Sequence, residues 1–170
     1  MNMSNIGLAL ASVDIDDIRV PGFIDVSEKP ARFYPLFRAI YFECQGTLIR
    51  FGAIGDSGRM LVAQAETITV DVELDEEMLP ACSSLREMVL RDPDGPNKVA
   101  AVHLWDGRDT TGGLECAAVR FDIMNGQQIF LDPSYYFGIR LGGSEQQSIW
   151  SENLLNSELR SVEVRRKGAA

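Results

Sequence analysis

The sequence predicts a mainly β domain, an antiparallel β barrel or sandwich with one short helix near residues 82–91. Two observations predict it. Residues 114–133 carry the strongest hairpin signal in the chain, and short strand-like apolar runs follow one another between turns rich in Gly and Pro. An α+β arrangement is the alternative. With 170 residues, 45% of them hydrophobic and 24% charged, the chain suits a single domain with a sizeable core.

The hairpin at residues 114–133 predicts its own register. A three-residue loop, 124–126, places Val119 opposite Leu131 and Phe121 opposite Ile129, so apolar side chains meet. A two-residue loop would instead place Val119 opposite an aspartate. The third loop residue is a glycine, which the left-handed position of such a loop requires. We therefore expect the three-residue loop.

Other strands are expected along the chain, with 66–74 as the cleanest because its apolar and polar residues alternate strictly. Residues 37–43 are expected to pair with 47–53, although the apolar spacing in 33–44 also fits a helix. The glycines of 52–58 lack a phosphate-loop motif and predict a turn. The expected strands are 18–20, 37–43, 47–53, 59–64, 66–74, 99–105, 135–141 and 148–150.

The remaining segments are expected to form a helix, a loop and the two ends of the chain. Residues 80–91 are the best helix candidate, with Ser84 and Glu87 spaced as a capping box. Residues 106–113 are expected as a flexible polar loop, and 157–164 are left undecided. Residues 1–30 are expected as a loosely packed N-terminal arm, and 165–170 as a frayed C-terminal tail. The whole chain is otherwise expected as one domain.

The net charge of −9 argues against nucleic acid and anionic membrane surfaces as partners, because both bind basic patches. It is compatible with a basic protein partner. Three cysteines, Cys44, Cys82 and Cys116, are widely spaced and odd in number, which favours reduced thiols in a cytosol over a disulfide framework. No apolar run is long enough for a membrane span, and no signal peptide is expected. The sequence indicates neither a metal nor a cofactor.

His103 is the single histidine, so a catalytic Ser-His-Asp or Cys-His site would have to use it. It lies inside an apolar strand, where a hydrogen-bonded structural histidine is the ordinary interpretation. Cys116 and Cys44 are the candidate nucleophiles from neighbouring strands. The strand pairing that would bring either thiol to the imidazole does not follow from sequence spacing.

Aromatic residues supply the candidate binding residues. Three rings follow one another at Tyr135, Tyr136 and Phe137, directly after a turn, so an extended chain cannot bury all three in one core. Trp105 and Trp150 complete the set, because aromatic side chains are enriched at binding hot spots. Ordinary packing over an open barrel end is the alternative.

The hypothesis for function is a non-catalytic, acidic, protein-binding module in a bacterial cell, of the immunity or inhibitor type or an accessory subunit. Its partner is another protein, or a second copy of this chain. The first alternative is a small hydrolase-like enzyme that uses His103 with a cysteine or a carboxylate. The second is a carrier that holds a small apolar ligand inside a β barrel.

Overall fold

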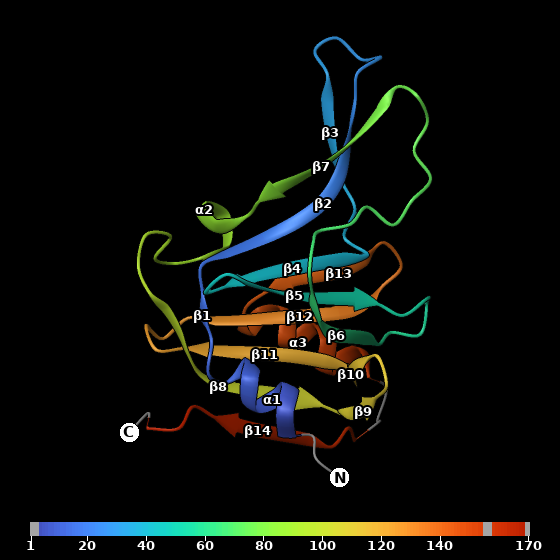
Figure 1. Cartoon of the computed structure of the whole chain (residues 1–170). Coiled ribbons are helices and arrows are strands. Elements are labelled where there is room, and N and C mark those ends of the chain that lie inside the picture. Colours follow the sequence, from blue (N-terminus) through green and yellow to red (C-terminus); the bar gives the residue numbers. More distant parts are fainter. Residues whose placement is uncertain (1–3, 155–157, 169–170) are drawn as a thin grey trace.

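The computed structural model describes residues 4–154 and 158–168. Two antiparallel sheets face each other, and three short helices lie among the described residues (Figure 1). The predicted mainly β fold is confirmed. The arrangement is a curled sheet facing a second sheet, with side chains of both filling the space between them.

The first sheet has six strands in the order β1-β8-β11-β12-β13, with β14 also paired to β8. Among the strands of the described residues β13 pairs only with β12, so it is an edge strand. The bounds of these strands are β1 Asp14–Ile15, β8 Asn97–Trp105, β11 Ala118–Ile123, β12 Gln128–Tyr135, β13 Gly138–Gly142 and β14 Ser161–Arg165.

The second sheet has eight strands in the order β3-β2-β4-β5-β6-β10-β9, with β7 also paired to β2. The ends of β2, β3 and β7 extend beyond the rest of the molecule at the top of Figure 1. The bounds are β2 Asp17–Asp25, β3 Arg32–Pro35, β4 Ala39–Cys44, β5 Thr47–Ala53, β6 Met60–Ala65, β7 Met78–Ser84, β9 Arg108–Thr110 and β10 Gly113–Cys116.

The predicted hairpin register is confirmed. Val119 lies opposite Leu131 and Phe121 opposite Ile129, and the Ile123 N–H donates to the Gln127 carbonyl across a three-residue loop. The first arm of the hairpin is nevertheless divided. Residues 113–116 pair with β6 in one sheet and 118–123 pair with β8 in the other, so the chain changes sheet at Ala117.

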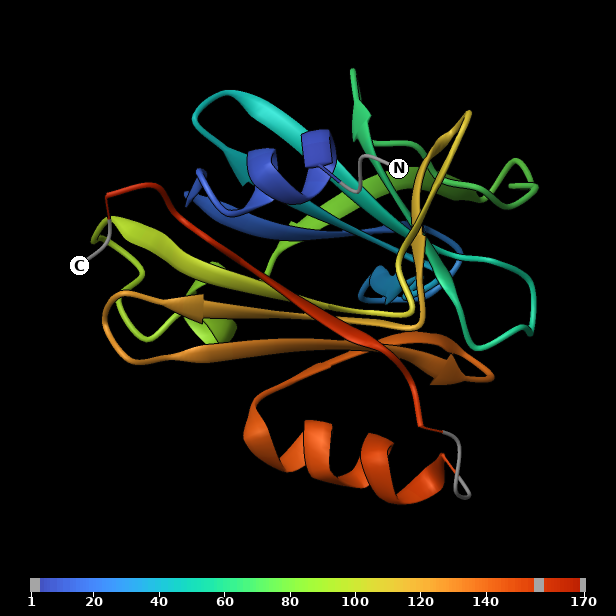
Figure 2. The same cartoon turned by 90° about the horizontal axis from the view of Figure 1, so that it is seen from below.

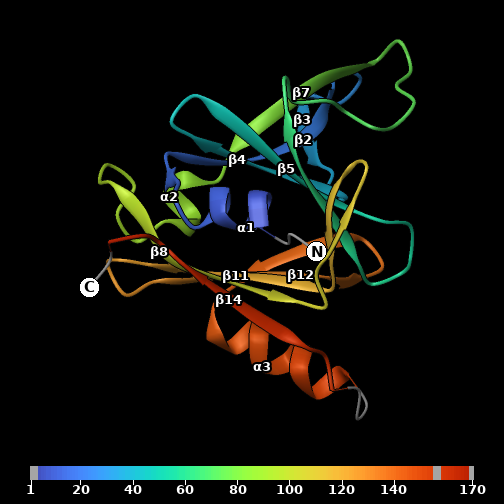
Figure 3. The same cartoon turned by 60° about the horizontal axis from the view of Figure 1, so that its bottom comes forward.

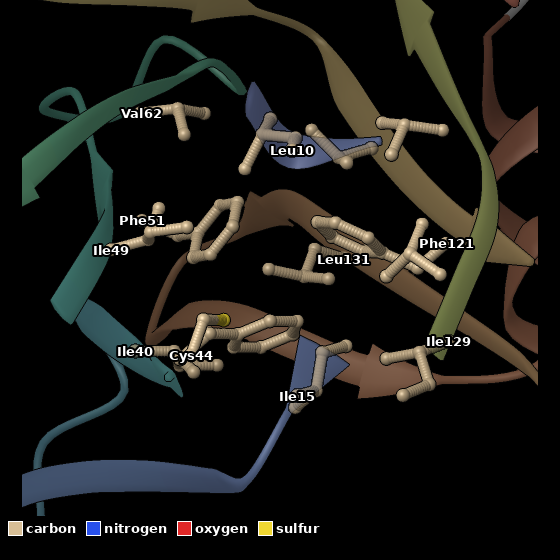
Figure 4. Close-up of a cluster of buried hydrophobic side chains, with 14 of the residues drawn as sticks. Leu10, Ile15, Ile40, Cys44, Ile49, Phe51, Val62, Phe121, Ile129 and Leu131 are labelled. Atoms are coloured by element: carbon tan, nitrogen blue, oxygen red, sulfur yellow. The ribbon is translucent and has the colours of Figure 1, made fainter. Parts of the chain in front are cut away.

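The core lies between the sheets (Figure 4). Phe42 and Phe51 from the eight-stranded sheet meet Phe121 from the six-stranded sheet, with ring centroids 5.1 and 5.9 Å from that of Phe121. Leu10 of the first helix and Ile15 of β1 are also buried in this cluster. Alternation along the strands produces this burial, because every second side chain faces the opposite sheet.

The helices occupy three different places. α1 (Ser4–Leu10) lies along the open side between the two sheets (Figure 3), and α3 (Ser144–Asn153) covers the outer face of the six-stranded sheet (Figure 2). α2 (Arg86–Val89) is a single turn that follows β7. α3 therefore gives the six-stranded sheet a second, smaller apolar layer on its outer face.

The helix alternative for residues 33–44 is wrong, because β4 and β5 form the expected hairpin. The expected strand at 66–74 is also wrong. This segment joins β6 to β7, which lie on opposite sides of β5, β4 and β2, so it has to cross the sheet. It is tied there by Tyr41, whose hydroxyl lies 3.1 Å from Thr69 Oγ1, and by the 2.7 Å Arg50–Asp71 ion pair. A crossing segment lies beside no strand edge, so its alternation produces no strand.

The helix expected near residues 82–91 is much shorter than predicted. Residues 78–84 pair with β2 as β7, and only 86–89 are helical. Ser84 Oγ accepts from the Arg86 N–H at 3.2 Å, but among the described residues it forms no bond with Glu87, so the expected capping box is incomplete. The expected strand at 148–150 is wrong as well, because these residues lie within α3. Residues 106–113, expected as a loop, contain β9 and the start of β10.

The loose packing expected for residues 1–30 is wrong for residues 10–22, whereas 26–30 are mostly exposed. Leu10, Ala11, Ile15 and Ile18 are buried, and β2 pairs with three other strands. The tail expected at 165–170 begins later than predicted, since Arg166 forms a 2.8 Å ion pair with Asp14. Residues 1–3 and 169–170 lie outside the described residues.

Candidate functional site

Tyr136 and Phe137 form the turn between β12 and β13. Their exposed fractions are 75% and 83%, and their rings pack edge to face with centroids 5.2 Å apart. Gly138 follows with φ +120°, and a Cβ there would lie 2.3 Å from the Phe37 carbonyl oxygen. Only glycine allows this close approach, so the turn is held against the residues before β4 while its two rings stand in solvent.

Tyr135 is half-buried beside this turn. The Arg140 guanidinium lies over its ring, 3.5 Å from the centroid, and Nη1 donates to the phenol oxygen at 2.8 Å. Gln146 of α3 also donates to that oxygen, at 3.3 Å. Tyr135 therefore orients Arg140, whose side chain remains at the surface of β13.

Trp105 and Trp150 lie elsewhere, in the apolar layer beneath α3. Trp150 is 3% exposed, and its ring centroid lies 5.4 Å from that of Trp105 and 5.5 Å from that of Phe130. The structure thus groups Tyr135, Tyr136 and Phe137 at one turn, while both tryptophans pack a helix onto a sheet.

A groove runs between α2 and β13, beside the aromatic turn. It consists of two adjoining hollows of about 370 and 470 Å³, both lined by Met88, Val89 and Leu141. The first hollow is mostly apolar and includes Phe37, Phe137 and Ile139. Met88 is 83% exposed, although methionine is an apolar side chain. We call this feature the α2–β13 groove; Leu85, Met88, Val89 and Arg91 line one wall and residues 137–143 the other.

The charges at the α2–β13 groove are opposite in sign to the charge of the chain. Arg140 lines the first hollow and Arg91 the second, while no Asp or Glu lines either. The Arg91 guanidinium donates to the Asn125 carbonyl at 3.2 Å. Gln127 fixes this wall, because its side chain accepts from the Arg91 N–H at 2.8 Å and donates to the Val89 carbonyl at 2.5 Å.

His103 lies on the outer face of the six-stranded sheet, within a polar cluster. Its Nε2 is 2.7 Å from Arg120 Nη2 and 2.8 Å from Asp122 Oδ2. Arg120 Nη1 also donates to Gln147 of α3 at 3.0 Å. No Ser, Thr or Cys side chain among the described residues hydrogen-bonds to the imidazole. The cluster joins β8, β11 and α3, and it holds a histidine–carboxylate pair with no nucleophile beside it.

The candidate nucleophiles are not placed for catalysis. Cys44 and Cys116 are buried in the core between the sheets, whereas His103 faces outward. Burial raises the pKa of each of these two thiols to about 12. Both are neutral thiols near pH 7 and poor nucleophiles. Cys82, on β7, is exposed.

Side chains of both sheets pack against one another in the space between the sheets. A surface hollow of about 470 Å³ lies beside α1, lined by residues that include Ile6, Leu10, Cys44 and Ile49. Among the described residues no group of three or more His, Cys, Asp or Glu side chains could hold a metal ion. Within the same residues no helix is long and apolar enough to cross a membrane.

The fold defines the class of protein as an antiparallel β domain of two facing sheets. Comparisons with protein-family models, with curated proteins and with solved structures find no match to this chain.

Sequence reasoning missed Met88, Arg91 and Phe37 as lining residues of the groove. In the helix expected at 80–91, Met88 lies on the apolar face, which normally packs inward. Because residues 78–84 are a strand, the single helical turn that remains leaves Met88 exposed. No local signal in the sequence joins these residues to β13.

Proposed function

We propose that this protein is a non-catalytic binding module that holds an apolar stretch of a partner protein in the α2–β13 groove. One observation carries the proposal: Met88, Tyr136 and Phe137 are each at least 75% exposed around a groove with an apolar lining. Exposed aromatic and methionine side chains beside a hollow are typical of protein-binding surfaces. The rigid turn at Gly138 supports the proposal, because ordered side chains lose less entropy on binding.

The chemistry of His103 and of the two buried cysteines favours a binding module over the enzyme alternative. The imidazole of His103 lacks a nucleophile among the described residues, and the buried thiols are protonated. Immunity proteins, inhibitors and accessory subunits act by occupying a partner, so they need a surface of this kind and no reactive centre. We propose such a role in a bacterial cytosol, where the exposed thiol of Cys82 would stay reduced.

Capture of partners from a lysate of the native cell tests the proposal. The wild-type chain should enrich its partner proteins. We expect their recovery to fall about tenfold or more with Phe137→Asp and with Met88→Asp, because each substitution places a charge at a binding hot spot. Leu79→Asp is the matched control, since Leu79 is 51% exposed on β7 and does not line the groove. Equal recovery with all variants would refute a binding role for the groove.

A further inference from the structure

We infer that the segment bound in the α2–β13 groove is extended and acidic, with carboxylate side chains that alternate with apolar ones, and that it adds to the edge of β13. This inference rests on the proposed function and names the chemistry of the partner. It is carried by three features of the groove: a strand edge, an apolar floor and a cationic rim.

The strand edge favours an extended occupant. The Ile139 N–H donates to the Phe37 carbonyl at 2.7 Å, so it points away from β12. Backbone groups of successive residues in an antiparallel strand point to opposite sides, and those of Leu141 therefore point the same way. Leu141 lines both hollows of the groove. An extended segment can hydrogen-bond to this edge, whereas a helix has already used its own N–H and C=O groups.

The floor of the groove favours apolar side chains at alternate positions. Side chains of an added strand alternate between its two faces, so one set would enter the hollows. Those hollows offer Val89, Ile139 and Leu141 to that set. The hydrogen bond between Ile139 and Phe37 closes the edge at one end. At the other end the Gly143 carbonyl accepts from the Gln147 N–H of α3, so the segment would pair at Leu141.

The rim favours carboxylates on the other set of side chains. Arg91 and Arg140 are exposed, one at each hollow, and neither forms an ion pair with a described residue. A lining with two arginines and no acid is complementary to carboxylates, which guanidinium groups bind through charge-assisted hydrogen bonds.

The positive charge of the groove and the negative net charge of the chain favour partner surfaces of opposite sign. The net charge of −9 acts at long range and favours a partner that is basic overall. At physiological ionic strength such interactions are screened beyond about 8 Å, so the arginines within reach decide which segment enters the groove. The partner would therefore present an acidic segment, whatever its overall charge.

Two labelled octapeptides, blocked at both ends, test the inference. One alternates valine with glutamate and the other valine with lysine, and fluorescence anisotropy measures their binding to the full chain. We expect the glutamate peptide to bind at least tenfold more tightly. Arg91→Glu combined with Arg140→Glu should reverse this preference. Arg32→Glu combined with Arg160→Glu is the matched control, since it changes the net charge equally outside the groove and should keep the preference.

Hydrogen exchange of the complex with the glutamate peptide tests strand addition. We expect slower exchange at the Leu141 amide, because it would donate to the added strand. Binding without this protection would overturn strand addition. Equal binding of the two peptides, or no binding of either, would overturn the acidic assignment. If Phe137→Asp still abolished partner capture in either case, the proposed function would stand while this inference failed.

Discussion

Glu115 joins two arginines at the point where the chain passes between the sheets. Arg59 Nε donates to Glu115 Oε1 at 2.5 Å, and Arg108 Nη2 donates to the same oxygen at 2.6 Å. Arg59 also forms a 2.6 Å ion pair with Asp106. Hydrogen bonds from Arg59 and Arg108 hold the pKa of Glu115 below its usual value. The carboxylate form is therefore the one that the folded state favours.

Glu115 predicts a pH dependence of stability. A carboxylate whose pKa is lowered by folding stabilises the fold at pH values above the ordinary glutamate pKa of about 4.3, and this contribution disappears as the pH falls through the lowered value. We expect Glu115→Gln to be less stable than the wild type at pH 7 and to approach it in acid, as urea unfolding at several pH values would show. Glu152→Gln, which removes an exposed carboxylate that forms no ion pair with a described residue, is the control. Parallel curves for wild type and Glu115→Gln would contradict the prediction.

α3 shows how an element is fixed to a sheet from outside. Asp132 of β12, 1% exposed, accepts from Gln146 Nε2 at 2.8 Å, and Trp150 packs on Phe130 one turn further along the helix. A polar anchor and an apolar anchor therefore lie on the same face of the helix. Together they bury ring surface that the outer face of the sheet would otherwise expose.

Trp150→Ala should destabilise the protein by about 3 kcal/mol or more, because it leaves a cavity beneath the helix. Ile149→Ala, at a position that is 43% exposed, should cost less than about 1 kcal/mol and serves as the control. Urea unfolding measures both. Trp105 would be the single tryptophan left in the Trp150→Ala variant, and we expect its emission to shift to the red as solvent reaches it. Equal losses for the two variants would show that α3 is not held by this ring.

The elements also show where sequence patterns fail. The alternation of apolar and polar residues at 66–74 is typical of a strand. A strand also needs the edge of another strand to pair with, and this segment crosses the sheet and meets none. The apolar residues of 80–91 fit a helix, yet residues 78–84 pair with β2 because tertiary contacts outweigh local propensity. For the candidate site, the sequence singled out the three consecutive rings at 135–137, but it placed them in a strand at 135–141 that the turn at Tyr136 and Phe137 interrupts. It held no sign of the opposite wall at Met88.

On the scale of the whole molecule, the chain changes sheet at Ala117, and both sheets supply one shared core. Strands of the eight-stranded sheet occur early in the chain and again at 108–116, on either side of residues that build the other sheet. Neither sheet could therefore keep its buried face covered without the other. This arrangement predicts one cooperative folding unit.

Unfolding transitions from three probes should coincide if this is so. Tryptophan emission reports the outer layer under α3, labelling of the buried thiols of Cys44 and Cys116 reports the core between the sheets, and circular dichroism reports the strands. We expect one midpoint of urea unfolding for all three, with labelling performed in short pulses. A Cys82→Ser background removes the exposed thiol. Separate midpoints would indicate that the sheets unfold independently.

The sequence by itself determined the β class of this protein and the register of its central hairpin, and it indicated that the three consecutive rings at 135–137 would not all be buried in one core. These features depend on side chains that are close along the chain, where alternation and a loop glycine carry the necessary information. Only the tertiary structure decided which strands share a sheet, why residues 66–74 remain unpaired and how α2 comes to face β13. Such pairings join segments far apart in the chain, and each forms because it completes hydrogen bonds and covers apolar surface that no single segment can complete or cover alone.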